Sequence, residues 1–406
     1  MDKRIIFHID VNNAFLSWSA IYLLKTGYHI DIRKMPSIIG GSETTRTGIV
    51  LAKSNIAKKF GIVTAETIYQ AKKKCPQLQV FPPNYTWYTK KSFELFNYLE
   101  KYSPSIEIYS IDECFMDMSG TSLLYENHEE LAKKIKDEIY DLFGFTVNIG
   151  IGNNKLCAKM ASDFEKPNKV HTLYNNEITE KLWPLPVSEL FMCGKKTSIK
   201  LNQIGINTIG ELAKYDQNKL KRIFKNQAIN LIESANGIDN SKVENKASKN
   251  ESISITETLT FDCSNKEKLK EILFSQSEEI GRKLRKKGMY ANTIAIIYKN
   301  FLFKSNTHQT KLDSSINKTT EIYQNIKNLL EDSYSGEAIR LIGIRLSDLT
   351  KESKKQISLF EEEKIDNKDD KVQEILDNIN EKFGKTGITY ASMKVRNKER
   401  LEKRVK

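Results

Sequence analysis

Two apolar, strand-forming segments of this 406-residue chain carry carboxylates where a buried strand tolerates charge poorly. Arg4–Asp10 (RIIFHID) has the pattern of a buried strand and ends on Asp10. Ile106–Met118 (IEIYSIDECFMDM) has strand composition and is interrupted by Asp112 and Glu113. If the two strands are neighbours in one sheet, the three carboxylates meet. This possibility constrains both the fold and the chemistry.

The segments around these strands predict an α+β domain with a ferredoxin-like arrangement. Apolar periodicity and end signals predict several helices and a third strand. The helices are expected at Phe15–Lys25, the end of Ile49–Phe60, Tyr88–Tyr102, Glu129–Phe143 and Lys155–Phe164, and the strand at Thr146–Ile151. The order is that of a strand, a long insertion, and then strand, helix, strand and helix.

Three further parts are expected beyond this domain. A small helical unit is predicted from about residue 184 to 237, followed by a polar linker at 238–251. A second α+β unit is predicted at about 252–350, with a charged tail after it. Its expected strands are Ile253–Phe261, Thr293–Tyr298 and Ile339–Leu349, its expected helices are Lys266–Lys287 and Thr319–Ser333, and a late helix in the tail covers about Lys371–Phe383.

Composition narrows the class of protein. The net charge is +12, with the excess mainly in the middle and later parts, and a basic surface favours a polyanion such as nucleic acid. A generic lysine-rich surface gives the same charge. The five cysteines are scattered without a CxxC pair, and we expect a reduced, cytoplasmic, monomeric protein. We find neither a signal-peptide pattern nor the roughly 20 apolar residues that a membrane helix needs.

Three clustered carboxylates suit one kind of chemistry in particular. Mg²⁺ takes hard oxygen ligands and keeps water and phosphate oxygens in its coordination shell. Two such ions about 3.5–4 Å apart can hold an in-line phosphoryl displacement. One ion activates a hydroxyl nucleophile and the other binds the triphosphate with its leaving group. Strand-end carboxylates that merely face water are the alternative, which we prefer for Asp10 taken alone.

Four segments together resemble a known family. They are HIDVNNAF, GSETTRTGIVLAKSNIAKKFG, SIDECFMD and GIGNNKLCAKMASDFEKPN. Their order and spacing resemble Y-family DNA polymerases of the bacterial polymerase IV (impB/mucB/samB) type, over about residues 1–350. The resemblance implies an α+β right-hand polymerase fold. Its parts would be a ferredoxin-like palm (1–10 and 75–165), small fingers (11–74), a helical thumb (166–237), a linker (238–251) and an α+β little finger (252–350).

The resemblance also implies an activity. Such an enzyme adds deoxynucleotides from their triphosphates to the primer end on primed template DNA, with low fidelity, in translesion synthesis. Two Mg²⁺ ions are the implied cofactors. The implied roles are metal binding by Asp10, Asp112, Glu113 and the carbonyl of Val11, exclusion of the ribose 2′-hydroxyl by the steric gate Phe15, and triphosphate binding by Lys58 and Lys166.

Several positions depart from the family's usual pattern. Asn12 and Asn13 stand where Asp-Cys is frequent, and Ala14 stands where a second aromatic is usual. Asn55 replaces a tyrosine found in many members near the triphosphate. Lys58 replaces a frequent arginine, and a lysine cannot form the two-point hydrogen bonds of a guanidinium group. The three carboxylates are unaffected, so these changes bear on nucleotide affinity and lesion preference.

Two regions are expected to hold DNA. The segment FMCGKKTSIKLNQIGINTIGEL resembles the thumb's tandem helix-hairpin-helix, in which Gly205 and Gly210 would offer backbone N–H groups to phosphate. Met192 occupies the first hairpin's glycine position. A basic run near the end of the little-finger helix would contact template backbone. It consists of Arg282, Lys283, Arg285, Lys286 and Lys287.

The tail contains the segment QISLF, residues 356–360, which resembles the sliding-clamp-binding peptide of bacterial polymerases. Leu359 and Phe360 would anchor in an apolar groove, with Gln356 preceding them. Two other functions remain open at this point. One is a two-metal nuclease that uses the same carboxylates, and the other is a non-catalytic DNA- and clamp-binding accessory protein. The absence of a GxxxxGKST loop argues against an ATPase.

Overall fold

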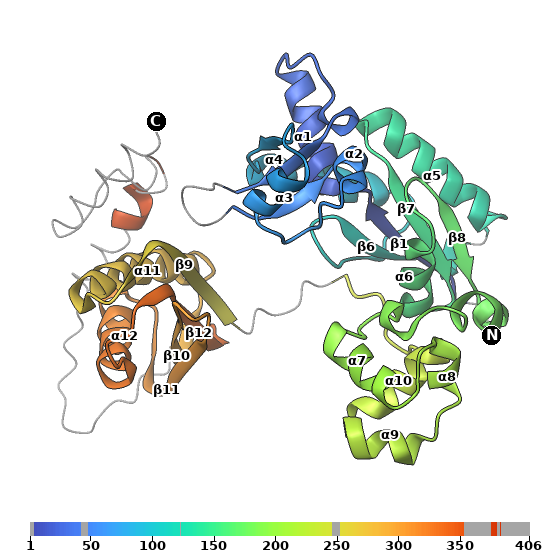
Figure 1. Cartoon of the computed structure of the whole chain (residues 1–406). Coiled ribbons are helices and arrows are strands. Elements are labelled where there is room, and N and C mark those ends of the chain that lie inside the picture. The colour runs from blue at the N-terminus through green and yellow to red at the C-terminus, as the bar shows by residue number, and fades with distance from the viewer. Residues whose placement is uncertain are drawn as a thin grey trace. The chain divides into compact units, whose positions relative to one another are not determined.

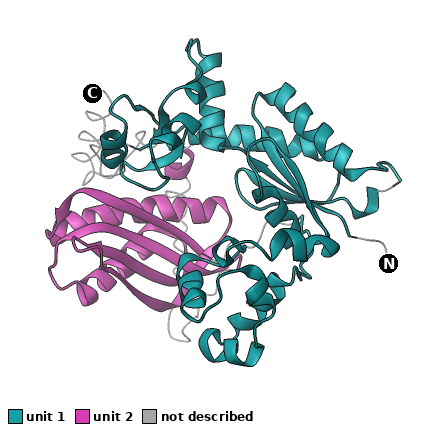
Figure 2. Ribbon diagram, turned by 45° about the vertical axis from the view of Figure 1, so that its right-hand side comes forward, with its two compact units in different colours: residues 1–43, 48–248 teal, residues 44–47, 249–406 magenta. Residues whose placement is uncertain are grey.

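The chain forms two compact units, which Figure 2 shows in separate colours. The first consists of residues 1–43 and 48–248, and the second of residues 44–47 and 249–406. The computed structural model describes residues 4–41, 48–121, 123–245, 252–352, 375–379 and 382. Mixed helices and strands in both units confirm the expected α+β class.

The first unit is built on a five-stranded sheet with β1 at its centre (Figure 1). The strands lie in the order β5 (Ile106–Ile108), β6 (Glu113–Asp117), β1 (Ile6–Val11), β7 (Val147–Gly152) and β8 (Val170–Leu173). Strand β1 pairs antiparallel with both β6 and β7. The two carboxylate-bearing segments are therefore neighbours, as the sequence suggested.

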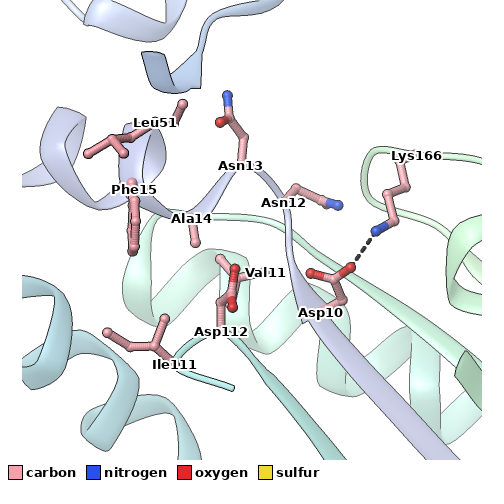
Figure 3. Close-up of a pocket in the computed structure, with 11 residues that line it drawn as sticks. Asp10, Val11, Asn12, Asn13, Ala14, Phe15, Leu51, Ile111, Asp112 and Lys166 are labelled. Carbon is pink, nitrogen blue, oxygen red and sulfur yellow. Dashed lines mark hydrogen bonds and ion pairs between the residues drawn. The ribbon is translucent and has the colours of Figure 1, made fainter. Parts of the chain in front are cut away.

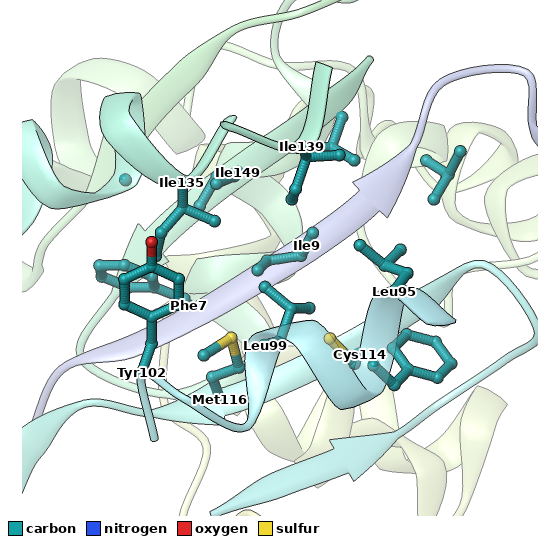
Figure 4. Close-up of a cluster of buried hydrophobic side chains, with 14 of the residues drawn as sticks. Phe7, Ile9, Leu95, Leu99, Tyr102, Cys114, Met116, Ile135, Ile139 and Ile149 are labelled. Carbon is teal, nitrogen blue, oxygen red and sulfur yellow. The ribbon is translucent and has the colours of Figure 1, made fainter. Parts of the chain in front are cut away.

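Strand alternation divides the sheet into an apolar face and a face that carries the site. Phe7, Ile9 and Val11 of β1 point into the large core (Figure 4). Helices α1 (Ala14–Lys25), α4 (Tyr85–Leu99) and α5 (His128–Phe143) supply the opposing side chains of that core. Each fully buried side chain of this kind contributes about 1.5–3 kcal/mol. His8 and Asp10 consequently point to the other face.

Helix α6 (Lys155–Asp163) covers this second face at very short range. A Cβ atom on Gly150 of β7 would lie 2.0 Å from the Ala158 carbonyl oxygen, so only glycine allows the approach. Ala158 packs with Ile6 and Phe115 beneath the helix. The close approach brings polar side chains of α6 next to the carboxylates of β1 and β6.

A small sheet forms the part that we expected to be the fingers. Its strands lie in the order β3 (Val50–Lys53), β2 (Ser37–Gly40) and β4 (Gln79–Phe81), with helices α2 (Asn55–Lys59) and α3 (Ile68–Lys74) beside them. Strand β4 lies beyond residue 74, the expected end of the fingers, and pairs with β2.

A helical cluster follows the five-stranded sheet. It contains η4 (Ile178–Leu182), α7 (Lys195–Gln203), α8 (Ile209–Ala213), α9 (Gln217–Phe224) and α10 (Gln227–Ala235). Leu156, Cys157 and Met160 of α6 belong to the hydrophobic core of this cluster. On the two sides of residue 165, the expected boundary, α6 thus shares the helical core and β8 still belongs to the sheet.

In the described residues of the second unit, a four-stranded antiparallel sheet packs with α11 (Lys266–Lys286) and α12 (Thr319–Ser333), and residues 375–379 are also helical. The strands lie in the order β11 (Ser305–Ile316), β10 (Tyr290–Asn300), β12 (Ile339–Thr350) and β9 (Ser252–Cys263). Both helices contribute to its core. Among the described residues, no helix is long and apolar enough to cross a membrane.

Candidate active site

Asp10, Asp112 and Glu113 meet at one end of the β1–β6 pair. Asp10 lies directly opposite Glu113 in the strand register. The Val11 N–H donates to the Asp112 carbonyl oxygen at 3.1 Å, so backbone pairing fixes all three positions. A cavity of about 290 Å³ opens here (Figure 3). It is lined by Asp10, Val11, Asn12, Asn13, Ala14, Phe15, Leu51, Ala52, Ile111, Asp112 and Lys166.

Glu113 faces α6 rather than the cavity, and His8 lies behind it. The His8 Nε2 atom is 3.4 Å from a Glu113 carboxylate oxygen, and His8 Nδ1 shares a 2.8 Å hydrogen bond with the Ser162 hydroxyl. His8 is fully buried, and burial lowers its pKa.

Two lysines supply positive charge to the carboxylates. The Lys159 ammonium on α6 lies 3.3 Å from Glu113, 3.4 Å from Asp163 and 3.9 Å from Asp10. Lys166 bonds to Asp10 and lies 2.8 Å from Asp163 (Figure 3). Lys166 is among the residues expected from the sequence. Lys159 is not, and its only signal in the sequence is its spacing four residues before Asp163.

The two adjacent carboxyl groups of the Asp112-Glu113 pair have opposite electrostatic surroundings. Burial raises the pKa of Asp112, and the charges of Asp10 and Glu113 raise it further. Burial acts in the same direction on Glu113, but His8 and Lys159 outweigh it and hold the pKa of Glu113 at about 2. The ionised form of Asp112 is therefore destabilised by its neighbours, and an added cation would stabilise it.

The carboxylates fit a hard divalent cation by their chemistry. They offer oxygen ligands at the edge of an open cavity, and Asp112 is destabilised by its anionic neighbours. In the part of the chain that the structure describes, no three His, Cys, Asp or Glu side chains converge closely enough to form a ready metal site. The lysines lie between the carboxylates instead, so metal binding requires side-chain rearrangement.

Comparisons with known proteins connect this geometry to a family. The sequence profile of the impB/mucB/samB family matches residues 9–163, and that of the family's C-terminal domain matches residues 250–359. The chain is 46% identical to the DNA polymerase IV of Clostridium acetobutylicum over 382 residues, which cover 94% of this chain and 96% of the relative. This chain belongs to the Y-family of DNA polymerases.

Other relatives extend the same assignment. DNA polymerase IV 1 of Bacillus subtilis is 34% identical over 94% of this polymerase and 91% of its own length. A solved Y-family DNA polymerase chimera has the same fold, with a TM-score of 0.75 and 24% identity over 85% of this chain and 98% of that chain. These matches confirm the right-hand polymerase fold expected from the sequence.

The structure places the expected steric gate, Phe15, in the cavity wall of this polymerase. The half-buried ring stacks on Tyr88 with centroids 4.7 Å apart and an interplanar angle of 11°. Trp18 and Tyr85 contact it from other directions. The neighbouring rings thus hold the Phe15 ring in place in the cavity wall.

Lys58 lies on α2, exposed, and is not among the residues that line the cavity. Burial lowers the pKa of Lys53, and the charge of Lys58 lowers it further, so the two ammonium groups are close. Asn55 begins the same helix. Lys53 and Lys58 are therefore neighbouring cations beside the small sheet, and the ammonium group of Lys58 has no partner among the described contacts.

The two glycines expected to contact DNA have different surroundings. Gly205 lies between α7 and α8 with φ +84°, exposed, and nothing would contact an added Cβ. Gly210 is buried, and its Cβ would lie 2.9 Å from Trp183, so helix packing requires this glycine. Met192 is 75% exposed. Its backbone has φ +66°, a left-handed conformation that a glycine adopts more easily.

The basic run on α11 is partly occupied by internal contacts. Arg285 forms a two-point ion pair with Asp377 at 2.7 and 3.0 Å and donates to the Asn317 carbonyl oxygen at 2.6 Å. Lys283 lies 3.1 Å from Glu279. Arg282, Lys286 and Lys287 complete the run. Arg285 is therefore held within the unit, whereas Lys287 at the end of the run is exposed.

Proposed function

We propose that this polymerase extends primer ends on damaged as well as intact template, using Asp10, Asp112 and Glu113 to bind two Mg²⁺ ions. The pairing of Asp10 with Glu113, with Asp112 at the same cavity, is the observation that supports this. Bound Mg²⁺ would lower the pKa of the primer hydroxyl and neutralise charge on the transferring phosphate. The Val11 carbonyl is proposed as a further ligand.

The cavity wall would then select and orient the nucleotide. Phe15 would lie against the sugar, where a 2′-hydroxyl would collide with its ring. Lys166 is bound to Asp10 and Asp163 here, and the Asp10 carboxylate raises its pKa although burial opposes this. It would thus stay charged and exchange these partners for triphosphate oxygens, with Lys58 reaching the same group from α2.

DNA would be held mainly through its backbone. We propose that the helical cluster acts as the thumb, with the exposed turn at Gly205 near phosphate, and that residues 252–350 act as the little finger. The net charge of +12 supports sequence-independent binding. A ternary complex of a Y-family relative has been solved, which supports binding of primed template and nucleotide.

Primer extension tests the proposed activity directly. With a labelled primer on intact and lesion-containing templates, Mg²⁺ and deoxynucleotides, we expect template-dependent lengthening. The reaction is a phosphoryl transfer whose nucleophile is the primer hydroxyl, so omission of nucleotide should leave the primer intact. Shortening of the primer would instead indicate a two-metal nuclease, and no change would indicate an accessory protein.

We further propose that Gln356, Leu359 and Phe360 bind a sliding clamp; these residues lie outside those that the structure describes. Backbone contacts alone release DNA readily at physiological salt, and tethering would raise the effective concentration of the enzyme. Leu359→Ala with Phe360→Ala should abolish clamp-stimulated synthesis and leave clamp-free synthesis unchanged. Product length with and without loaded clamp is the measurement. Equal stimulation of both proteins would show that another surface tethers the clamp.

A further inference from the structure

The loop between α6 and β8, residues 164–169, carries Lys166 to the edge of the cavity. Two asparagines from the sheet hold this loop by its backbone. Asn148 lies on β7, fully buried, and Asn12 follows β1 directly after Val11. Alternation along β7 places Asn148 on the face of the sheet that α6 covers.

Every hydrogen-bonding group of the Asn148 amide is used. Its Nδ2 donates to the carbonyl oxygens of Ser162 and Glu165 at 3.0 and 2.7 Å. Its Oδ1 accepts from the Lys169 N–H at 3.2 Å and from the Asn12 Nδ2 at 3.1 Å. A carboxamide offers two donor hydrogens and two acceptor lone pairs, so this side chain is saturated.

Asn12 completes the arrangement. Its Oδ1 accepts from the Asn168 N–H at 2.8 Å while its Nδ2 donates to Asn148. The pair therefore bonds to backbone groups on both sides of Lys166: Ser162, Glu165, Asn168 and Lys169. Lys166 lies within a segment whose position two buried side chains determine.

We propose that Asn12 and Asn148 are positioning residues for nucleotide binding, which hold the loop so that Lys166 meets the incoming triphosphate. The inference rests on the proposed role of Lys166. A lysine ammonium on its flexible side chain loses conformational freedom when it binds phosphate. Fixing the backbone on both sides of Lys166 beforehand reduces the freedom that remains to be lost, so nucleotide affinity should depend on the amide pair.

The test compares nucleotide affinity in two backgrounds. The dissociation constant of the correct deoxynucleotide is measured with a dideoxy-terminated primer, template and Mg²⁺, so that no chemistry follows. Asn148→Ala should raise this dissociation constant about tenfold, because the loop backbone loses its hydrogen bonds to the Asn148 amide. In a Lys166→Ala background the same change should raise it less than about twofold, because the two residues act through one contact.

Asn154 provides a matched control at the other end of α6. It is also a buried asparagine, accepting from the Cys157 N–H at 2.8 Å and donating to the Gly237 carbonyl oxygen at 2.7 Å. Asn154→Ala should lower thermal stability as Asn148→Ala does, but leave the nucleotide dissociation constant unchanged. A purely structural role for Asn148 would make the two variants behave alike.

Equal effects of Asn148→Ala in both backgrounds would overturn the inference, and so would an effect of Asn154→Ala as large as that of Asn148→Ala. If Asn148→Ala does not fold, Asn12→Ala carries the same comparison, since it removes the bond to Asn168 and leaves those of Asn148 to the backbone. An unchanged constant in Lys166→Ala alone would overturn the role of Lys166 together with this inference. Failure of the wild-type protein to extend a primer would instead overturn the proposed activity.

Discussion

Replacing Asp10, Asp112 or Glu113 by alanine, one at a time, should slow primer extension by about 10³-fold or more and leave DNA affinity nearly unchanged. Each substitution removes one of the three proposed anionic ligands, and Asp10 and Asp112 are the carboxylates that line the cavity among the described residues. Single-turnover extension rates and binding to labelled primed template measure the two quantities. Near-normal extension by Asp112→Ala would contradict the metal assignment.

Two comparisons separate catalysis from folding in these variants. Glu107→Gln neutralises a partly buried carboxylate of β5 that does not line the cavity; this carboxylate lies 2.6 Å from the Lys155 ammonium. The Glu107→Gln variant should extend primers at the wild-type rate. Asp112→Asn should lose activity yet unfold at an equal or higher temperature without metal. Because the folded state raises the pKa of Asp112, its ionised carboxylate costs stability, and this cost grows as pH rises through the folded pKa.

Phe15→Ala should reduce discrimination against ribonucleotides by roughly 10²-fold. The ring forms part of the cavity wall and is held against Tyr88, so its removal opens space without an obvious side chain to refill it. The ratio of kcat/KM for a deoxynucleotide to that for the matching ribonucleotide is the measurement.

Tyr85→Ala is the matched aromatic control for this prediction. Tyr85 contacts the Phe15 ring edge-on at 6.0 Å, but it is 55% exposed and does not line the cavity. Its loss should leave sugar discrimination almost unchanged. A ratio that Phe15→Ala does not alter would mean that Phe15 serves only the packing around Tyr88.

Part of the central sheet could be predicted, because RIIFHID and TVNIGI have strand composition with apolar residues at regular places. The segment expected as one strand at Ile106–Met118 forms two, β5 and β6, and β8 was not predicted. Helices such as α12, with regular apolar spacing, match their expected bounds. The register that sets Asp10 opposite Glu113 depends on the pairing of two strands that are far apart in the sequence. The pattern of each strand taken alone does not show this register.

Other elements escaped prediction for physical reasons. Strand β11 (SNTHQTKLDSSI) is an edge strand that is mostly exposed, so no apolar alternation marks it. Strands β2, β3 and β4 are only three or four residues long. Lys159 resembles any helical lysine in sequence, and only the close approach of α6 to β7 reveals its place among the carboxylates.

The position of α6 limits how this enzyme could be recombined with its relatives. One side of the helix fills the core of the helical cluster through Leu156, Cys157 and Met160, and another directs Lys159 to the carboxylates. A crossover at residue 165 would join a foreign helical cluster to the native α6 and mismatch that core. A transplanted helical cluster would need its own α6, and that helix would bring a new lysine to the host's carboxylates. The helical cluster and the surroundings of the carboxylates can therefore be exchanged only together in this chain.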